Sequence, residues 1–299
     1  MRTYSPVRSC LVVAALLALS AGLPARSRLA QAPREGTLFV SAVDTSGEPV
    51  EGLGPEVFVV REDGVRREIV RVSRATEPID IAILVDNSAA VSDGLIFLRR
   101  ALSSFVARMA PGNQVALVGL ADRPTILVDY TDDPKRLTDG AQLFSVPDSG
   151  MTLLDAIFET SEGLGRRETP RAVLVAVVTD GPELSNRYSQ DVVAAAQEAD
   201  AALHLVTIGQ FYYAEEHGTR ERSLLLDAGP RKTGGQRISL LTPHALEDTL
   251  QRLARELSAQ YKVVYGRPES LIPAEGVEVS SARQGVTMRG APLRGAPGA

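Results

Sequence analysis

The stretch that decides the fold is residues 79–90, IDIAILVDNSAA. A nearly unbroken apolar run ends in Asp86, Asn87 and Ser88. Such a run, without polar alternation, is typical of a strand buried on both faces of a parallel sheet. A second run of this kind, residues 172–180, AVLVAVVTD, also ends in an aspartate, Asp180. We therefore expect two carboxylates at the carboxyl ends of two buried strands.

Further apolar β-type runs and helical stretches alternate on both sides of these strands. The alternation is the signature of a parallel sheet covered by helices on both faces. The sequence predicts an α/β class with a doubly wound, mostly parallel sheet over residues 77–260. The other expected strands are QVALVGLA (114–121), TILVDY (125–130), ALHLVTIG (202–209) and QRISLL (236–241), and the expected helices lie near 94–110, 153–163, 190–200 and 243–260.

The flanks of this region have a different pattern. Between residues 33 and 76, apolar and polar residues alternate at period two, which predicts a small accessory antiparallel β domain. Short β-type segments within residues 261–289 are expected to return to it, and residues 290–299, rich in Gly, Pro and Arg, are predicted to be a disordered tail.

The first 32 residues have the layout of a signal peptide. Arg2 and Arg8 precede the apolar run 11–23, which is short of the roughly 20 residues that span a bilayer. We expect an exported protein, periplasmic or extracellular, with an uncleaved anchor as the alternative. Cys10 is the only cysteine and lies in this segment, so disulfides and thiolate metal sites are not expected downstream.

Charge and motif content exclude several functions. The net charge of -5 argues against nucleic acid as a partner, because no excess of Lys or Arg exists to displace phosphate counterions. No phosphate-binding loop or nucleophile elbow occurs, and we expect no enzyme. His204, within an apolar run, is expected to be a core histidine with satisfied hydrogen bonds, while His217 and His244 lack the paired spacing of a zinc site.

The expected ligand site is where the two aspartates meet. In open α/β sheets, ligands bind beyond the carboxyl ends of the strands, where the strand order reverses. Between the two aspartate strands, the stretch 149–156, SGMTLLDA, adds the hydroxyl of Thr152 at a helix start. Carboxylates and hydroxyls together favour a hard cation, Mg²⁺, with Mn²⁺ or Ca²⁺ as alternatives. The competing interpretation is helix capping, because Ser, Thr and Asp are preferred N-caps.

The segments DNSAA, SGMTLLDA and VVTDG resemble the three parts of the metal-ion-dependent adhesion site of von Willebrand factor A domains. The resemblance implies a Rossmann-like fold and Asp86, Ser88, Thr152 and Asp180 as metal-site residues. Ala90 departs from the family pattern, which has a second serine ligand there. The flanking β segments are similar to those of an exported branch found in acidobacteria and their relatives.

Two functions follow as alternatives. The resemblance implies an exported binding or adhesion module, in which a protein partner's acidic residue completes the shell of an ion held by this degenerate site. The other alternative is a structural scaffold of an envelope assembly with the metal site vacant, which Ala90 favours. Hydrolysis by a metal-activated water would need a dedicated base that the sequence does not offer. Nothing in the sequence identifies the partner or the oligomeric state.

Overall fold

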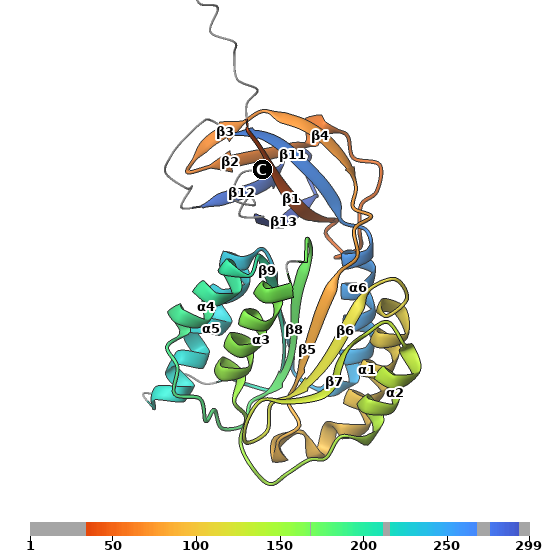
Figure 1. The fold of residues 1–299 in the computed structure, drawn as a ribbon, viewed down its shortest axis with the longest axis vertical. Coiled ribbons are helices and arrows are strands. Elements are labelled where there is room, and N and C mark those ends of the chain that lie inside the picture. Colours follow the sequence, from red (N-terminus) through yellow and green to blue (C-terminus); the bar gives the residue numbers. More distant parts are fainter. Residues whose placement is uncertain (1–33, 168, 212–215, 268–275, 293–299) are drawn as a thin grey trace, which may run out of the picture. The chain divides into compact units, whose positions relative to one another are not determined.

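The computed structural model describes residues 34–167, 169–211, 216–267 and 276–292, so the expected signal peptide lies outside the described residues. Its central sheet has the strand order β10-β9-β8-β5-β6-β7 (Figure 1). β5 is parallel to both of its neighbours, β6 and β8, and the chain builds first to one side of β5 and then to the other. The sheet is therefore doubly wound, as predicted, with its switch point between β5 and β8. Its strands are β5 (Asp80–Val85), β6 (Gln114–Gly119), β7 (Thr125–Thr131), β8 (Ala172–Thr179), β9 (Ala201–Ile208) and β10 (Arg237–Leu240).

The strand β7 is the exception to the parallel arrangement. It pairs with β6 in the antiparallel sense at the edge of the sheet. The connection from Gly119 to Thr125 is too short for a crossover helix, and a parallel return needs about a dozen residues or more. The fold class is thus confirmed as mostly parallel, with one antiparallel edge strand.

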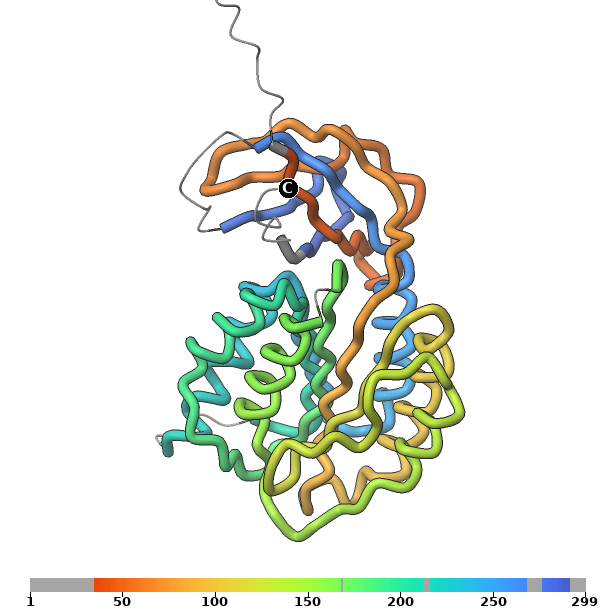
Figure 2. The backbone as a smooth tube through the Cα atoms, in the orientation of Figure 1, coloured from red at the N-terminus to blue at the C-terminus, as the bar shows by residue number. Residues whose placement is uncertain are grey.

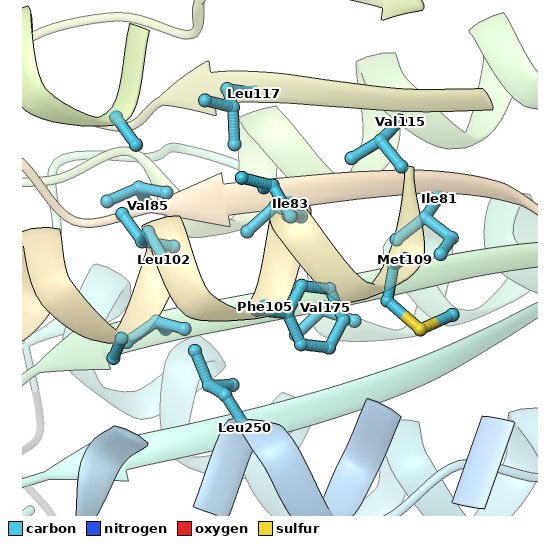
Figure 3. Close-up of a cluster of buried hydrophobic side chains, with 14 of the residues drawn as sticks. Ile81, Ile83, Val85, Leu102, Phe105, Met109, Val115, Leu117, Val175 and Leu250 are labelled. Atoms are coloured by element: carbon cyan, nitrogen blue, oxygen red, sulfur yellow. The ribbon is translucent and has the colours of Figure 1, made fainter. Parts of the chain in front are cut away.

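Helices cover both faces of this sheet and bury its alternate residues. On one face Ile81, Ile83 and Val85 of β5 pack with Leu102 and Phe105 of α1 (Figure 3). The opposite face buries Ala82 and Leu84 against the other set of helices. Every residue of β5 and β8 is buried, which is why neither sequence alternates. The helices are α1 (Leu95–Met109), α2 (Pro134–Leu143), α3 (Leu153–Arg167), α4 (Ser189–Glu198), α5 (His217–Thr233) and α6 (Leu246–Ser258), with short 3-10 turns at Pro55–Val57, Ala89–Gly94 and Pro243–Ala245.

Two of these helices, α2 and α5, were not expected from the sequence. The helix α2 begins at Pro134, and Asp133 caps it by accepting hydrogen bonds from two backbone N–H groups. Asp133 is therefore the N-cap of this helix. The helix α5 contains Pro230 close to its end, and Gly234 closes it in the left-handed conformation. These breakers hid its periodicity.

The remaining strands form two antiparallel sheets rather than one. The first has the order β13-β1-β11-β4 and the second β12-β2-β3. β1 pairs with β11 on one side and with β13 on the other, so the first and last described strands lie side by side (Figure 2). The extents of the accessory β domain and of residues 77–260 as a domain stay predictions. These strands are β1 (Arg34–Val43), β2 (Phe58–Glu62), β3 (Val65–Arg67), β4 (Ile69–Arg74), β11 (Tyr261–Arg267), β12 (Val277–Ser281) and β13 (Thr287–Pro292).

The tail predicted at 290–299 begins too early. Gly290 and the two residues after it belong to β13 and pair with β1, so the strand continues to Pro292. Polar contacts also join the strands to α6: Arg289 donates to Glu256 at 2.9 Å, and Arg255 pairs with Glu48. Within the ranges that the structure describes, no helix is both long enough and apolar enough to cross a membrane.

His204 is buried in β9, as expected, but its hydrogen bonds are not satisfied. The residue is 2% exposed, and neither ring nitrogen has a hydrogen-bond partner. Burial lowers the pKa of His204 to about 4, so the ring is neutral at pH 7. The expectation of a satisfied core histidine was wrong, because the strand places the ring between packed layers where the neighbouring backbone groups are already paired within the sheet.

Candidate functional site

Asp86 follows the last residue of β5 and turns back toward β8. One carboxylate oxygen accepts from the backbone N–H of Ser88 at 2.9 Å, which closes a tight local turn. The other accepts from the backbone N–H of Thr179 at 3.1 Å and from the Thr179 hydroxyl. Asp86 is only 1% exposed, so these bonds replace the water that a buried carboxylate loses. The side chain therefore joins the ends of two central strands.

Ser88 has a buried side chain with an unused hydroxyl. It is fully buried, and its Oγ has no hydrogen-bond partner. Ser88 precedes the 3-10 turn Ala89–Gly94, yet its side chain forms no capping hydrogen bond. The capping interpretation therefore does not explain this hydroxyl. A buried hydroxyl without a partner costs free energy, and a ligand at this position would recover it.

Thr152 precedes α3 and is also turned away from a capping role. Its hydroxyl donates to the backbone oxygen of Leu120 at 2.8 Å, and Thr152 is 5% exposed. The first turn of α3 is capped instead by Glu183, which accepts from the Leu153 N–H at 3.1 Å, and by Ser185. A hydroxyl that donates its proton keeps lone pairs for a further contact.

Asp180 differs from Asp86 because its side chain is exposed. One of its oxygens accepts from the backbone N–H of Gln210 at 3.3 Å. Gly209 lies directly beside it: a Cβ at that position would come within 2.8 Å of the Asp180 carboxyl carbon, and the φ of Gly209 is +104°. Glycine is thus required where the end of β9 passes this carboxylate.

Ala90 lies against the glycine that follows Asp180. A Cβ on Gly181 would approach the Cβ of Ala90 to 2.8 Å and the Oγ of Ser88 to 3.6 Å. The position at which the family pattern has a second serine is therefore beside the Asp-Gly turn. Ala90 is itself exposed, so its neighbourhood has room for another atom.

The sheet brings the four sequence-predicted site residues to one edge. β5 and β8 run in parallel register, with Val85 opposite Val177, so Asp86 and Asp180 follow at the same end. Thr152 is bonded through both its backbone N–H and its hydroxyl to Leu120, the residue that follows β6. Backbone hydrogen bonds also join the three loops: the Ala89 N–H donates to Ser149, and the Met151 N–H donates to Pro182.

Sequence reasoning missed three polar residues at this edge. Asn87 accepts from the N–H groups of Leu120 and Ala121, and so fixes the loop after β6. Glu183 is 5% exposed, and burial raises its pKa to about 7. Arg222, from α5, is 4% exposed and donates to the backbone oxygen of Gly181. Asn87 could have been found from its place between two predicted ligands. Arg222 gave no signal, because α5 was not expected.

The donor set fits a hard cation with one oxygen fewer than the family pattern. Within the described ranges, no group of three or more His, Cys, Asp or Glu side chains is arranged to hold a metal ion. An ion at this edge would therefore depend on hydroxyl oxygens as well as carboxylates. The unpartnered Oγ of Ser88 is such an oxygen, which supports an oxygen-rich site and not a zinc-type one.

Comparisons with solved structures returned proteins of low identity. The chain is 12% identical to a von Willebrand factor type A protein from Catenulispora acidiphila, with a TM-score of 0.48 over 84% of this chain and 72% of that one. It is 13% identical, with a TM-score of 0.48 over 66% of this chain, to proximal thread matrix protein 1 from the mussel byssus, and spans 50% of that protein's length. Another structure of the mussel protein, with a zinc-occupied metal-ion-dependent adhesion site, is 14% identical, with a TM-score of 0.48 over 64% of this chain and 49% of that one.

The comparison with family models gave a match to one segment of the chain. No curated protein that was compared matches the chain. Residues 81–183 match the model described as von Willebrand factor type A domain. The matched segment runs from β5 to just beyond β8 and contains Asp86, Ser88, Thr152 and Asp180. Residues 81–183 are therefore similar to a von Willebrand factor type A domain.

Proposed function

We propose that this chain is an exported binding module, without catalytic activity, that recognises a protein partner at the edge formed by Asp86, Ser88, Thr152 and Asp180. The observation that carries the proposal is the buried, unpartnered hydroxyl of Ser88. A buried hydroxyl without a hydrogen-bond partner destabilises the folded chain. Its presence is explained if a ligand from outside the chain binds this oxygen.

The residues would share the work of holding a divalent cation, preferably Mg²⁺. Ser88 and Thr152 would offer hydroxyl oxygens, while Asp86 and Asp180 would supply negative charge. Asp86 is held by bonds to Thr179 and Ser88, so it provides a fixed charge rather than a movable ligand. A bound cation supplies one open position to which an oxygen of a partner's Asp or Glu can bind.

The surface near this edge supports a protein as the partner. Leu184 follows Asp180 closely, Leu241 follows β10, and Leu143 ends α2 just before the loop that leads to Thr152. All three are exposed, Leu143 and Leu241 at 80%. Large exposed apolar side chains near one polar site are typical of protein interaction surfaces.

Export is the part of the proposal that rests on sequence alone. The basic residues Arg2 and Arg8 and the short apolar run after them support a cleavable signal. The test is N-terminal sequencing of the protein from the envelope fraction. A chain that begins beyond about residue 25 supports export with cleavage. An intact Met1 in membranes would favour an uncleaved anchor.

A structural scaffold with no ion is the second candidate, and Ala90 favours it. Without the second hydroxyl, a cation would have to take a water in its place and would bind more weakly. The scaffold reading needs no cation, so its partner binding would not respond to chelators.

Affinity capture from the envelope fraction separates the two functions. The bait is the full chain, in Mg²⁺ and in a chelator, beside Asp180→Ala and the control Asp129→Ala, which removes an exposed carboxylate of β7. Recognition through the site predicts a partner that is lost both with chelator and with Asp180→Ala but kept by the control. A partner retained in all four samples would replace the adhesion function by the scaffold.

A further inference from the structure

A buried arginine lies at the same edge as the two aspartates. Arg222 projects from α5, is 4% exposed, and donates from Nη1 to the backbone oxygen of Gly181, the residue after Asp180. Its guanidinium carbon lies 5.1 Å from the ring centre of Phe211. Its Nε is buried and has no hydrogen-bond partner. The guanidinium is thus fixed in place, although its hydrogen bonds are incomplete.

Nearby carboxylates stabilise the positive charge of this buried guanidinium. Burial lowers the pKa of Arg222, and the carboxylates of Glu183, Asp180 and Asp86 act against that shift, in this order of strength. These groups come from the loops after β5 and β8, so the positive charge faces the site and not the solvent. Because Asp86 is itself buried, the interaction is screened little by water.

A permanent positive charge changes what the site can hold. A divalent cation that approaches Asp86 and Asp180 meets two attractive carboxylates and one repulsive guanidinium. A charge at position 222 would therefore change cation affinity through its electric field, even without contact with the cation. Ala90 acts in the same direction for a different reason, because it removes an oxygen ligand.

We propose that Arg222 is a built-in counter-charge to Asp86 and Asp180 and the positioning residue that weakens this site's hold on divalent cations. The proposal rests on the proposed function, since it presumes that the site takes a cation. Arg222 stabilises the two carboxylates when no cation is bound, and Ala90 and Arg222 make independent contributions to the weak affinity.

Calorimetric titration with Mg²⁺ tests this proposal in the full chain. Arg222→Gln removes the charge and keeps a donor for the Gly181 oxygen, whereas Arg222→Lys keeps the charge. The matched control is Arg220→Gln, which removes one positive charge from a half-buried position of the same helix, where Arg220 pairs with Glu221. Each change is made in the natural chain and together with Ala90→Ser, which restores the missing hydroxyl.

The expected result is a dissociation constant lower by on the order of tenfold in Arg222→Gln, with Arg222→Lys and Arg220→Gln close to the parent chain. Thermal unfolding with and without Mg²⁺ supplies a second readout: the upward shift of the midpoint should be larger in Arg222→Gln than in the parent. If the glutamine variant does not fold, Arg222→Met, which keeps the aliphatic packing, takes its place.

Three results would overturn the proposal. Equal Mg²⁺ affinity in Arg222→Gln and the parent, when Ala90→Ser does bind the ion, defeats the role of Arg222 and leaves the proposed function standing. An equal decrease of the Mg²⁺ dissociation constant in Arg220→Gln would show that the effect comes from net charge and not from the position of Arg222. No Mg²⁺ binding in any variant, including Ala90→Ser, defeats the cation site itself and this inference with it.

Discussion

The carboxylate of Asp86 accepts hydrogen bonds from both the backbone N–H and the hydroxyl of Thr179. This relationship joins the ends of β5 and β8, the two strands on either side of the switch point. It also distinguishes the two aspartates that the sequence presents as equivalent. Asp86 is buried and holds two strand ends together, whereas the side chain of Asp180 is exposed.

The first prediction follows from this difference. Asp86→Ala leaves the Thr179 hydroxyl and two backbone N–H groups without their acceptor, so it should lower the free energy of unfolding by about 2–4 kcal/mol. Asp86→Asn keeps one oxygen acceptor and should lose less. Urea unfolding at pH 7 measures both. Asp180→Ala is the control and should change stability by less than about 0.5 kcal/mol. Equal losses in Asp86→Ala and Asp180→Ala would contradict the distinction.

The second prediction concerns Ala90. Ala90→Ser should tighten Mg²⁺ binding by about tenfold, equivalent to about 1.4 kcal/mol, because the hydroxyl replaces a water among the ligands of a hard cation. Stability without Mg²⁺ should barely change, since Ala90 is exposed. Calorimetry and thermal midpoints with and without chelator measure the two effects. An unchanged affinity would mean that position 90 does not face the cation.

The third prediction is a pH dependence from Glu183. Burial raises the pKa of Glu183 from 4.5 to about 7 in the folded chain, so the folded state holds a proton that the unfolded state has already lost in this interval. Stability therefore falls as pH rises from 4.5 to about 7, by at most about 3 kcal/mol. Glu183→Gln should remove this slope while its amide oxygen still accepts from the Leu153 N–H. The difference between the two unfolding curves across this interval isolates the effect; a constant difference would refute it.

The fourth prediction has the opposite sign and concerns His204. Burial lowers its pKa from 6.5 to about 4. Between these two pH values the unfolded state therefore binds a proton that the folded state does not bind. Its contribution is complete above pH 6.5 and is lost as pH falls toward 4, by up to about 3 kcal/mol.

His204→Leu should remove that acid loss. It should also raise stability at pH 7 by about 1–3 kcal/mol, because two buried nitrogens without partners disappear. Unfolding at pH 7 and at pH 5 gives both quantities. A variant that is less stable than the parent at both pH 7 and pH 5 would contradict this prediction. It would show that the packing contacts of the imidazole ring outweigh the cost of its two unpaired nitrogens.

Much of the central sheet could be predicted because a strand that is buried on both faces has an almost continuous apolar sequence. Apart from Asp80 at the start of β5 and Thr179 at the end of β8, these two strands contain only apolar residues, so their parallel, covered position could be predicted. The aspartates at their ends, together with Thr152, indicated the candidate site at this edge of the sheet. The antiparallel course of β7 was open to the same reasoning, since the short connection after Gly119 leaves no room for a crossover helix.

What the sequence could not predict depends on contacts between distant segments. Pro230 and the polar first turns of α5 concealed the helix that carries Arg222 to the site. Glu183 lies in the loop after β8, and only the hydrogen bond that it accepts from the Leu153 N–H identifies it as a buried cap of α3. Each of the two antiparallel sheets combines strands from both ends of the described chain, and no local pattern specifies such pairing.

The most direct test of the account is a calorimetric titration of the full chain with Mg²⁺, beside Ser88→Ala and Asp180→Ala. The account predicts measurable binding by the parent chain and a loss of at least about tenfold in each variant, with folding retained. The replacement of Ser88 is the sharper of the two, because its hydroxyl has no other partner and its removal should cost no stability. Equal Mg²⁺ affinity in all three proteins, or binding in none of them, would contradict the account.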